Sequence, residues 1–199
     1  KETKFKIGKD YSPTSFTANN TLESEVVFGG YGLSVAGKPG VGYNSYADLN
    51  ATGKMVLLLR YVPEKVEGKR RQELMRSAAL VRKATVARTQ GAKGVIIVGG
   101  PNSQNSDKLI SVNYVRGASS SGVIALSGNH KLANALLATA GKGDLKKIQD
   151  DLDKENPHTP AGFVLPGIKI KVTAAVKKVT RPDYNIIAIL PPGVKGDNV

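Results

Sequence analysis

The sequence predicts an α/β fold built around one strand–helix–strand unit. Met55–Leu59 and Val95–Val98 are short apolar runs without a charged residue, which is typical of strands buried on both faces. Between them, residues 72–90 are rich in alanine and other good helix formers and contain no proline, and Gly91 provides a helix stop. A strand, a helix and a second strand in this order predict parallel strands joined by a right-handed crossover.

The residues before this unit are predicted to contribute one further strand. Residues 1–25 are polar and mixed, with turn signals at Tyr11–Pro13 and Ala18–Thr21. Val26–Leu33 is apolar but is interrupted by glycines at positions 29, 30 and 32. Glycines within a strand indicate a bulge or a close approach of backbone, and we expect one of the two here.

Four elements are predicted after the crossover. Val123–Leu126 has the composition of a buried strand, and a helix is expected from His130 to about Ala140, capped by the polar residues before it. Asp144 is expected to cap a second helix that continues through Leu152. From Ile168 to Val176, apolar residues alternate with residues that are mostly Lys and Thr, which predicts a strand with one exposed face.

The chain is strongly basic, with a net charge of +13, which is a feature of many nucleic-acid-binding proteins. Residues 54–93 alone hold eleven Lys and Arg against three Glu. Aromatic residues make up only 6% of the chain and do not interleave with this basic stretch, and no recognition-helix or RNA-binding signature is present. The sequence therefore argues against nucleic acid as a partner and favours a solvated basic helix face. It also lacks an apolar run of the roughly 20 residues that a membrane span requires.

The residue patterns of the common hydrolases are missing. The chain has no cysteine, its two histidines (His130 and His158) lie far apart in the sequence, and it has no His-Glu-x-x-His, His-x-Asp or paired-Glu pattern to hold zinc. Gly117–Gly122 contains three serines but does not satisfy the Gly-x-Ser-x-Gly pattern of a nucleophile. We therefore expect no catalytic residue, metal ligand or cofactor in this chain, with a serine hydrolase around Ser119–Ser121 as a competing hypothesis.

Two polar segments are candidates for contact with a peptide or another partner. The first directly follows the predicted strand Val95–Val98, at the end of a parallel sheet where ligands tend to bind. The second lies in the basic connector before the long predicted helix. The candidate residues are Asn102, Ser103, Gln104 and Asn105 in the first segment, and Arg70 and Arg71 in the second.

Five sequence blocks together resemble the protease-associated domain that is inserted in secreted di-zinc aminopeptidases. No block is diagnostic by itself, and the resemblance is carried by their order and spacing between about residues 24 and 193. The blocks are Val26–Leu33, Tyr46–Leu57, Gly91–Val98, Ile124–Ser127 and Asn185–Gly193.

The resemblance implies a swivelling β/β/α fold with small mixed sheets flanked by helices. It also implies three parts: an N-terminal flanking segment at residues 1–23, the protease-associated domain at 24–193, and a tail at 194–199 that leads to a peptidase domain absent from this chain. In this family the block corresponding to Asn185–Gly193 is the strand that re-enters the peptidase domain, and the zinc ligands and catalytic acid follow it. Zinc is therefore expected only in the absent peptidase domain.

The resemblance further implies a role as a lid or as a protein and peptide interaction module that shapes substrate access. The expected partners are the chain's own peptidase domain and its peptide substrates, and the expected location is outside the cytoplasm, secreted or periplasmic. Neither the residues nor the resemblance indicates an oligomeric state. The alternative function is a basic module at residues 54–93 that binds acidic polymers or nucleic acid.

Overall fold

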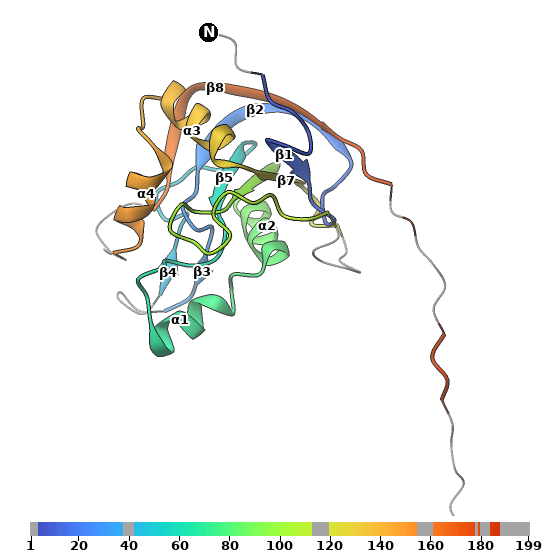
Figure 1. The fold of residues 1–199 in the computed structure, drawn as a ribbon, viewed down its shortest axis with the longest axis horizontal. Coiled ribbons are helices and arrows are strands. Elements are labelled where there is room, and N and C mark those ends of the chain that lie inside the picture. The colour runs from blue at the N-terminus through green and yellow to red at the C-terminus, as the bar shows by residue number, and fades with distance from the viewer. Residues whose placement is uncertain are drawn as a thin grey trace, which may run out of the picture.

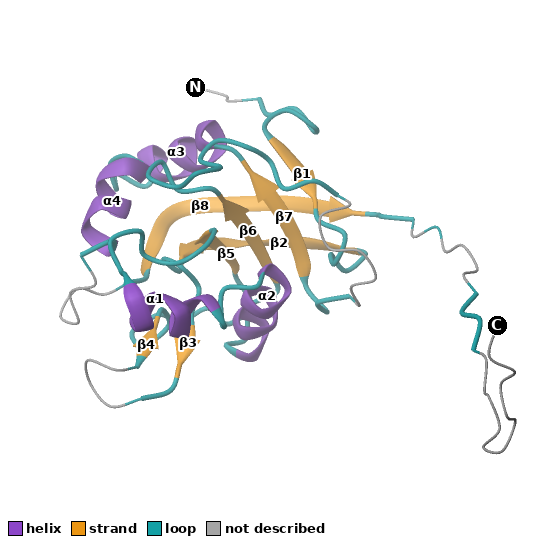
Figure 2. Ribbon diagram, turned by 60° about the horizontal axis from the view of Figure 1, so that its bottom comes forward, coloured by secondary structure: helices purple, strands orange, loops and turns teal. Residues whose placement is uncertain are grey.

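The computed structural model describes residues 4–37, 42–112, 120–154, 161–177, 179 and 184–187. Its main sheet has six strands in the order β1-β7-β6-β5-β2-β8 (Figures 1 and 2). Neighbouring pairs among β2, β5, β6 and β7 are parallel, and the edge strands β1 and β8 are antiparallel to their neighbours. The strands are β1 Tyr11–Pro13, β2 Asn20–Phe28, β5 Met55–Leu59, β6 Gly94–Val98, β7 Ile124–Gly128 and β8 Phe163–Ala174.

A second, two-stranded sheet and four helices complete the described fold. The small sheet pairs β3 (Ser34–Val35) with β4 (Tyr43–Asn44) in antiparallel fashion. The helices are α1 Gly68–Met75, α2 Leu80–Thr89, α3 His130–Thr139 and α4 Leu145–Leu152. This arrangement confirms the predicted α/β fold of small mixed sheets flanked by helices, including the parallel pairing of β5 with β6.

Alternate residues of the central strands pack into two separate hydrophobic clusters. In β5, Met55, Leu57 and Leu59 belong to one cluster, and Val56 and Leu58 to the other. The same alternation continues through β6 and β7, because successive side chains of a strand point to opposite faces. Side chains of α3 and α4 join the first cluster and those of α2 join the second, so the helices cover both faces of the sheet (Figure 2).

Two predicted helices after β7 are confirmed together with their caps. The Asn129 side chain accepts a hydrogen bond from the Leu132 amide at the start of α3. The Asp144 side chain accepts one from the Lys147 amide at the start of α4. Both residues satisfy an amide that has no partner within the helix, which is the reason that Asn and Asp are favoured there.

The single helix predicted over residues 72–90 is wrong, because the chain forms two helices separated by residues 76–79. Ala79 has a ψ of 134° and so interrupts the helical path. Leu74 of α1 packs into the first hydrophobic cluster, whereas Leu80 of α2 packs into the second. One continuous helix could not place both residues in their clusters, and the break reorients the chain between them.

The strand predicted over Val26–Leu33 is displaced toward the N-terminus. β2 begins at Asn20 and ends at Phe28, and Gly30 and Gly32 adopt φ values of 53° and 62°, which no strand accommodates. Its pairing with β8 is irregular between Glu25 and Val27. The segment predicted to flank the domain, residues 1–23, contributes β1 and the start of β2 to the main sheet.

Most of the alternating segment predicted at Ile168–Val176 lies in β8, which begins earlier than expected, at Phe163, and ends at Ala174. Beyond β8, residues 184–187 belong to no strand or helix and lie away from the packed body (Figure 1). The tail predicted at 194–199 lies outside the described residues. None of the described helices has the length and apolar character needed to cross a membrane.

Candidate functional site at the carboxyl edge of the sheet

Three loops meet where the parallel strands β2, β5 and β6 end, and we call them together the carboxyl edge. They are residues 29–33, 60–67 and 99–107. In open parallel sheets this is the edge at which ligands bind. Tyr61 in the second loop has a φ of 66° and is the only non-glycine residue with positive φ among the described residues. Such a conformation costs energy and is held only where surrounding contacts fix it.

Lys83 of α2 is the central buried polar group of this edge. Its side chain is fully buried, and its ammonium donates hydrogen bonds to three backbone carbonyls: those of Leu59 at 2.9 Å, Tyr61 at 2.6 Å, and Tyr31. Burial lowers the pKa of Lys83 well below its ordinary value. The three bonds use all three ammonium hydrogens, so Lys83 connects the loops after β2 and β5 and holds the Tyr61 carbonyl in place.

A second buried network joins the loop after β2 to α4. The Tyr31 hydroxyl donates to Asp153 Oδ1 and accepts a bond of 3.0 Å from Gln149 Nε2. The amide of Glu64 donates to the same Asp153 oxygen at 3.0 Å. Burial, followed by the bond to Asp153, raises the pKa of Tyr31 far above its ordinary value, so the phenol stays protonated as a donor.

The structure brings three of the predicted contact residues into these networks. Asn102 donates through its side chain to Asp150 at 2.9 Å and to Asp153 at 2.8 Å. Ser103 donates to Glu64 Oε1 at 2.6 Å. Asn105 donates to the Tyr61 hydroxyl at 2.9 Å. Each of these side chains therefore joins the loop after β6 either to the loop after β5 or to the end of α4.

The other three predicted residues are placed differently. Arg71 donates to Glu64 Oε2 at 3.3 Å, so that it shares this carboxylate with Ser103. Arg70 instead reaches the Gly42 carbonyl at 3.2 Å. Gln104 is exposed to solvent. The predicted set thus divides into residues that hold the edge together and residues on its surface.

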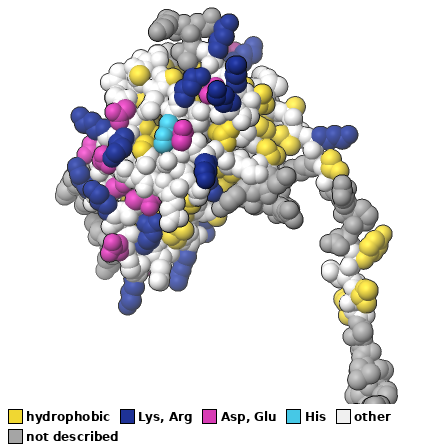
Figure 3. Space-filling view, viewed as in Figure 1, with side chains coloured by type: hydrophobic (Ala, Val, Ile, Leu, Met, Phe, Trp, Pro, Cys, Tyr) yellow, Lys and Arg dark blue, Asp and Glu magenta, His cyan; other side chains and the backbone are white. Residues whose placement is uncertain are grey.

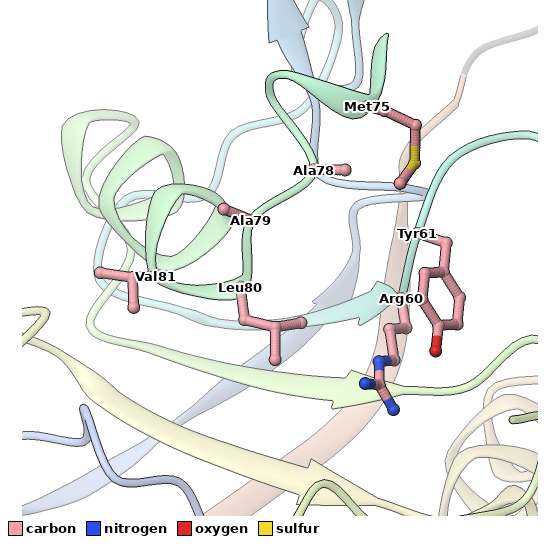
Figure 4. A pocket seen from close by; sticks show the side chains of 7 residues that line it. All are labelled: Arg60, Tyr61, Met75, Ala78, Ala79, Leu80 and Val81. Carbon is pink, nitrogen blue, oxygen red and sulfur yellow. The ribbon is translucent and has the colours of Figure 1, made fainter. Parts of the chain in front are cut away.

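A pocket of about 340 Å³ opens beside Tyr61, and we call it the Met75 pocket. Figure 4 shows Met75 and Tyr61 on one side of it and Ala79 and Leu80 on the other, with Arg60 between them. The Arg60 guanidinium lies 4.7 Å from the centre of the Tyr61 ring, a cation–π distance. The complete lining is Arg60, Tyr61, Met75, Ala78, Ala79, Leu80 and Val81.

Several basic side chains of residues 54–93 are buried or have a partner within the fold. Lys83 is buried, and Lys54 and Arg71 pair with Glu25 and Glu64 at 3.4 and 3.3 Å. Arg88 donates to the Ser121 carbonyl at 2.9 Å. On the face in Figure 3, Lys and Arg side chains are interspersed with Asp and Glu. Binding of acidic polymers by this segment stays a prediction.

His130 has a structural role at the same edge. Its backbone amide donates to Asp107 at 2.6 Å, and its ring Nε2 lies 2.8 Å from the Gly99 carbonyl oxygen, so α3 is attached to the loop after β6. Within the described parts of the chain, no three His, Cys, Asp or Glu side chains gather as a metal site would require. His158 and Ser119 lie outside the described residues.

Sequence reasoning missed Lys83, Tyr31 and Gln149, although two of them left a signal. Leu80, Lys83, Ala84 and Ala87 follow the spacing of one helix face, and all four are buried. Gln149 likewise lies one turn after Leu145 and one before Leu152, on the buried face of α4. A polar residue on an apolar helix stripe predicts a buried hydrogen-bond network, and this rule would have found both.

Comparison with known proteins adds little to this description. No family model and no curated protein matches the chain. Among solved structures, the chain is similar to an aminopeptidase from Aneurinibacillus sp. strain AM-1, with a TM-score of 0.44 and 23% sequence identity. The similarity covers 68% of this chain, which spans only 26% of that one.

Proposed function

We propose that this chain is a non-catalytic accessory domain of an exported zinc aminopeptidase. In this role it acts as a lid or as an interaction module that shapes the access of peptide substrates. The proposal rests on the sequence blocks that resemble the protease-associated domain. Four of these blocks contribute to β2, β5, β6 and β7, which are neighbours in one sheet.

One observation carries the proposal further: an apolar segment after β8 is almost fully exposed. Tyr184, Ile186 and Ile187 expose 84%, 97% and 83% of their surface. Figure 3 shows apolar side chains on the extended segment that leaves the body. Adjacent β-branched side chains such as those of Ile186 and Ile187 are normally buried in a sheet, so their exposure here supports the proposal that another structure covers them. The peptidase domain is the covering structure that the resemblance implies.

The chemistry of the carboxyl edge supports a positioning role. A lysine with a lowered pKa is often a nucleophile, but the Lys83 ammonium is fully buried and donates hydrogen bonds to three carbonyls. Tyr31 and Asp153 bond to each other, and Glu64 is shared by Ser103 and Arg71. These groups fix loops at the edge of the sheet, which a lid or binding surface requires.

Activity measurements test the proposal directly. The isolated chain, incubated with zinc and an aminoacyl p-nitroanilide, should release no product above the blank, whereas the parent protein should. Deleting residues 4–193 from the parent, which removes β1 and all of β2 as well, should change kcat/KM for long peptides more than for the p-nitroanilide, because only long substrates reach a lid. Zinc-dependent turnover by the isolated chain would refute the proposal.

Substitution of the exposed segment tests its burial in the parent. Ile186→Ser with Ile187→Ser should change the free energy of unfolding of the isolated chain by less than about 0.5 kcal/mol, since both side chains are exposed. In the parent, the same two substitutions should lower the free energy of unfolding by several kcal/mol, roughly 2–5 kcal/mol for each isoleucine that is buried there. Ile124→Ser is the matched control, because Ile124 is buried in β7 and the change should destabilise both forms. Equal, small effects in both forms would show that the segment is not covered.

A further inference from the structure

We propose that the Met75 pocket binds one apolar side chain of a partner peptide in which the flanking residues are acidic. This inference rests on the proposed role as an interaction module and gives that role a ligand class. Its two parts, an apolar anchor and a negative flank, follow from two independent features of the pocket.

The apolar anchor follows from the lining and the size of the pocket. Five of the seven lining residues are Met, Ala, Leu or Val. Met75 is 44% exposed at the opening, although the neighbouring Leu74 is fully buried in the core. A half-exposed methionine is a flexible apolar surface that adapts to different side chains. The volume of about 340 Å³ is at the small end of ligand sites, which suits one side chain with part of its backbone.

The floor of the pocket is fixed before any ligand binds. Arg60, Ala78 and Leu80 are 6%, 9% and 6% exposed. The Tyr61 carbonyl accepts from Lys83 and the Tyr61 hydroxyl from Asn105, so this lining residue is held at both ends. A preformed pocket avoids the entropic cost of ordering loops on binding.

The acidic flank follows from two arginines that are next to lining residues in the sequence, Arg76 and Arg82, and we call them the rim arginines. Arg76 directly follows Met75, Arg82 directly follows Val81, and both are exposed. Neither side chain makes a hydrogen bond or an ion pair with another described residue, so both guanidinium groups are available to a ligand. The first turn of α2 contains no acidic residue, and its cap residue Ala79 provides no side-chain hydrogen bond. The positive end of the helix therefore adds to the charge of the two arginines.

Binding is measured by fluorescence anisotropy of labelled peptides with the intact chain. The probe is the peptide Asp-Glu-Leu-Glu-Asp, labelled with fluorescein through a Gly-Gly spacer. One control peptide replaces Leu with Ser, and another replaces the four acidic residues with Lys; both carry the same label. The Ser peptide should bind about tenfold more weakly, because it loses the burial of one leucine side chain. The Lys peptide should not bind, and raising the salt concentration from about 50 to about 500 mM should weaken binding of the acidic probe peptide several-fold.

Variants of the chain locate the site. Met75→Glu and Ala79→Trp should each weaken binding of the probe peptide at least about tenfold. The glutamate repels the acidic residues of the probe, and the tryptophan fills the pocket. Arg82→Glu should weaken it several-fold. Lys93→Glu is the matched control, because it makes the same charge change at an exposed residue just before β6 and should leave binding unchanged. Met75 is 44% exposed at the end of α1, and the other three positions are exposed as well. Unchanged melting temperatures of the four variants confirm that they fold.

Several outcomes would overturn the inference. They are no binding of the acidic leucine peptide, equal binding of the serine peptide, and equal weakening by Lys93→Glu and Arg82→Glu. Displacement of the probe by heparin with no dependence on leucine would assign the rim to acidic polymers instead. Concentration-dependent self-association that Ala79→Trp abolishes would assign the pocket to a second copy. The aminopeptidase assay is separate, so failure of the proposed function is distinguishable from failure of this pocket.

Discussion

Lys83 and Arg82 are adjacent in the sequence, yet one positive side chain is buried inside the protein and the other is exposed to solvent. Lys83 is fully buried at the carboxyl edge, where three carbonyls accept its hydrogen bonds. Arg82 directly follows Val81, which lines the Met75 pocket, and its side chain is exposed and makes no ion pair with another described residue. A buried polar group must find partners within the protein, whereas an exposed one keeps water as its partner until a ligand arrives.

This difference separates stability from binding in the basic stretch at residues 54–93. Substitutions at the buried network should lower the free energy of unfolding, and substitutions at the rim should change ligand affinity only. The net charge of the stretch does not distinguish these roles, because both residues count equally toward it. Burial and hydrogen-bond partners distinguish them, and each of the following experiments tests that assignment.

The largest effect is expected for Lys83→Met. Methionine has a similar length and an unbranched side chain, so the packing of α2 is largely kept while three carbonyls lose their donor. Each buried polar group without a partner costs about 1–3 kcal/mol, so the variant should lose about 3 kcal/mol or more. Chemical denaturation of the purified chain measures this loss. Lys93→Met is the control at an exposed position and should stay within about 0.5 kcal/mol of the original chain. A loss no larger than that of the control would show that the three bonds contribute little.

A smaller effect is expected where one hydroxyl is removed from the network. Tyr31→Phe leaves Gln149 Nε2 without its acceptor and removes a donor from Asp153, which should cost about 1–3 kcal/mol. Tyr46→Phe is the matched comparison, since it also removes one phenol hydroxyl and Tyr46 is only 4% exposed. Its hydroxyl has no hydrogen-bond partner in the described structure, so its removal should leave stability unchanged or raise it. Equal losses in the two variants would contradict the distinction between engaged and unengaged buried hydroxyls.

The sequence predicted the parts of this fold that depend on local signals. β5 and β6 are uniformly apolar, and α3 and α4 carry Asn129 and Asp144 as caps, so each could be recognised without knowledge of its neighbours. β1 carries no such signal, because its three residues form a strand only through pairing with β7, more than a hundred positions away. The break between α1 and α2 was missed for the same reason, since it depends on two clusters that only the complete sheet creates.

In the candidate site, too, the features with a local sequence signal were predictable and those that depend on distant contacts were not. The position of Asn102, Ser103 and Asn105 at the carboxyl edge was predictable from the strand before them. Their partners were not, because Asp153, Glu64 and Tyr61 come from loops and helices that are 39 to 51 positions distant. Lys83 lies on the buried stripe of α2, but the stretch holds so many cations that a single buried one does not stand out.

The last comparison uses pH, and its sign follows from the burial of Lys83. Burial lowers the pKa of Lys83 in the folded chain, whereas the unfolded chain has an ordinary lysine pKa of about 10.4. At pH values between the folded and the unfolded pKa, the unfolded chain therefore binds more protons than the folded chain. The free energy of unfolding therefore rises with pH in this window, by up to about 1.4 kcal/mol for each pH unit. Lys83→Met lacks this contribution, so its stability relative to the original chain should fall further between about pH 8 and about pH 10. Denaturation curves of the original chain and of Lys83→Met at both pH values measure the difference in their free energies of unfolding. The contributions of all other titrating groups cancel in this difference. Parallel pH profiles would mean that the three carbonyls hold the ammonium strongly enough to offset its burial, and that the proton stays on Lys83 throughout.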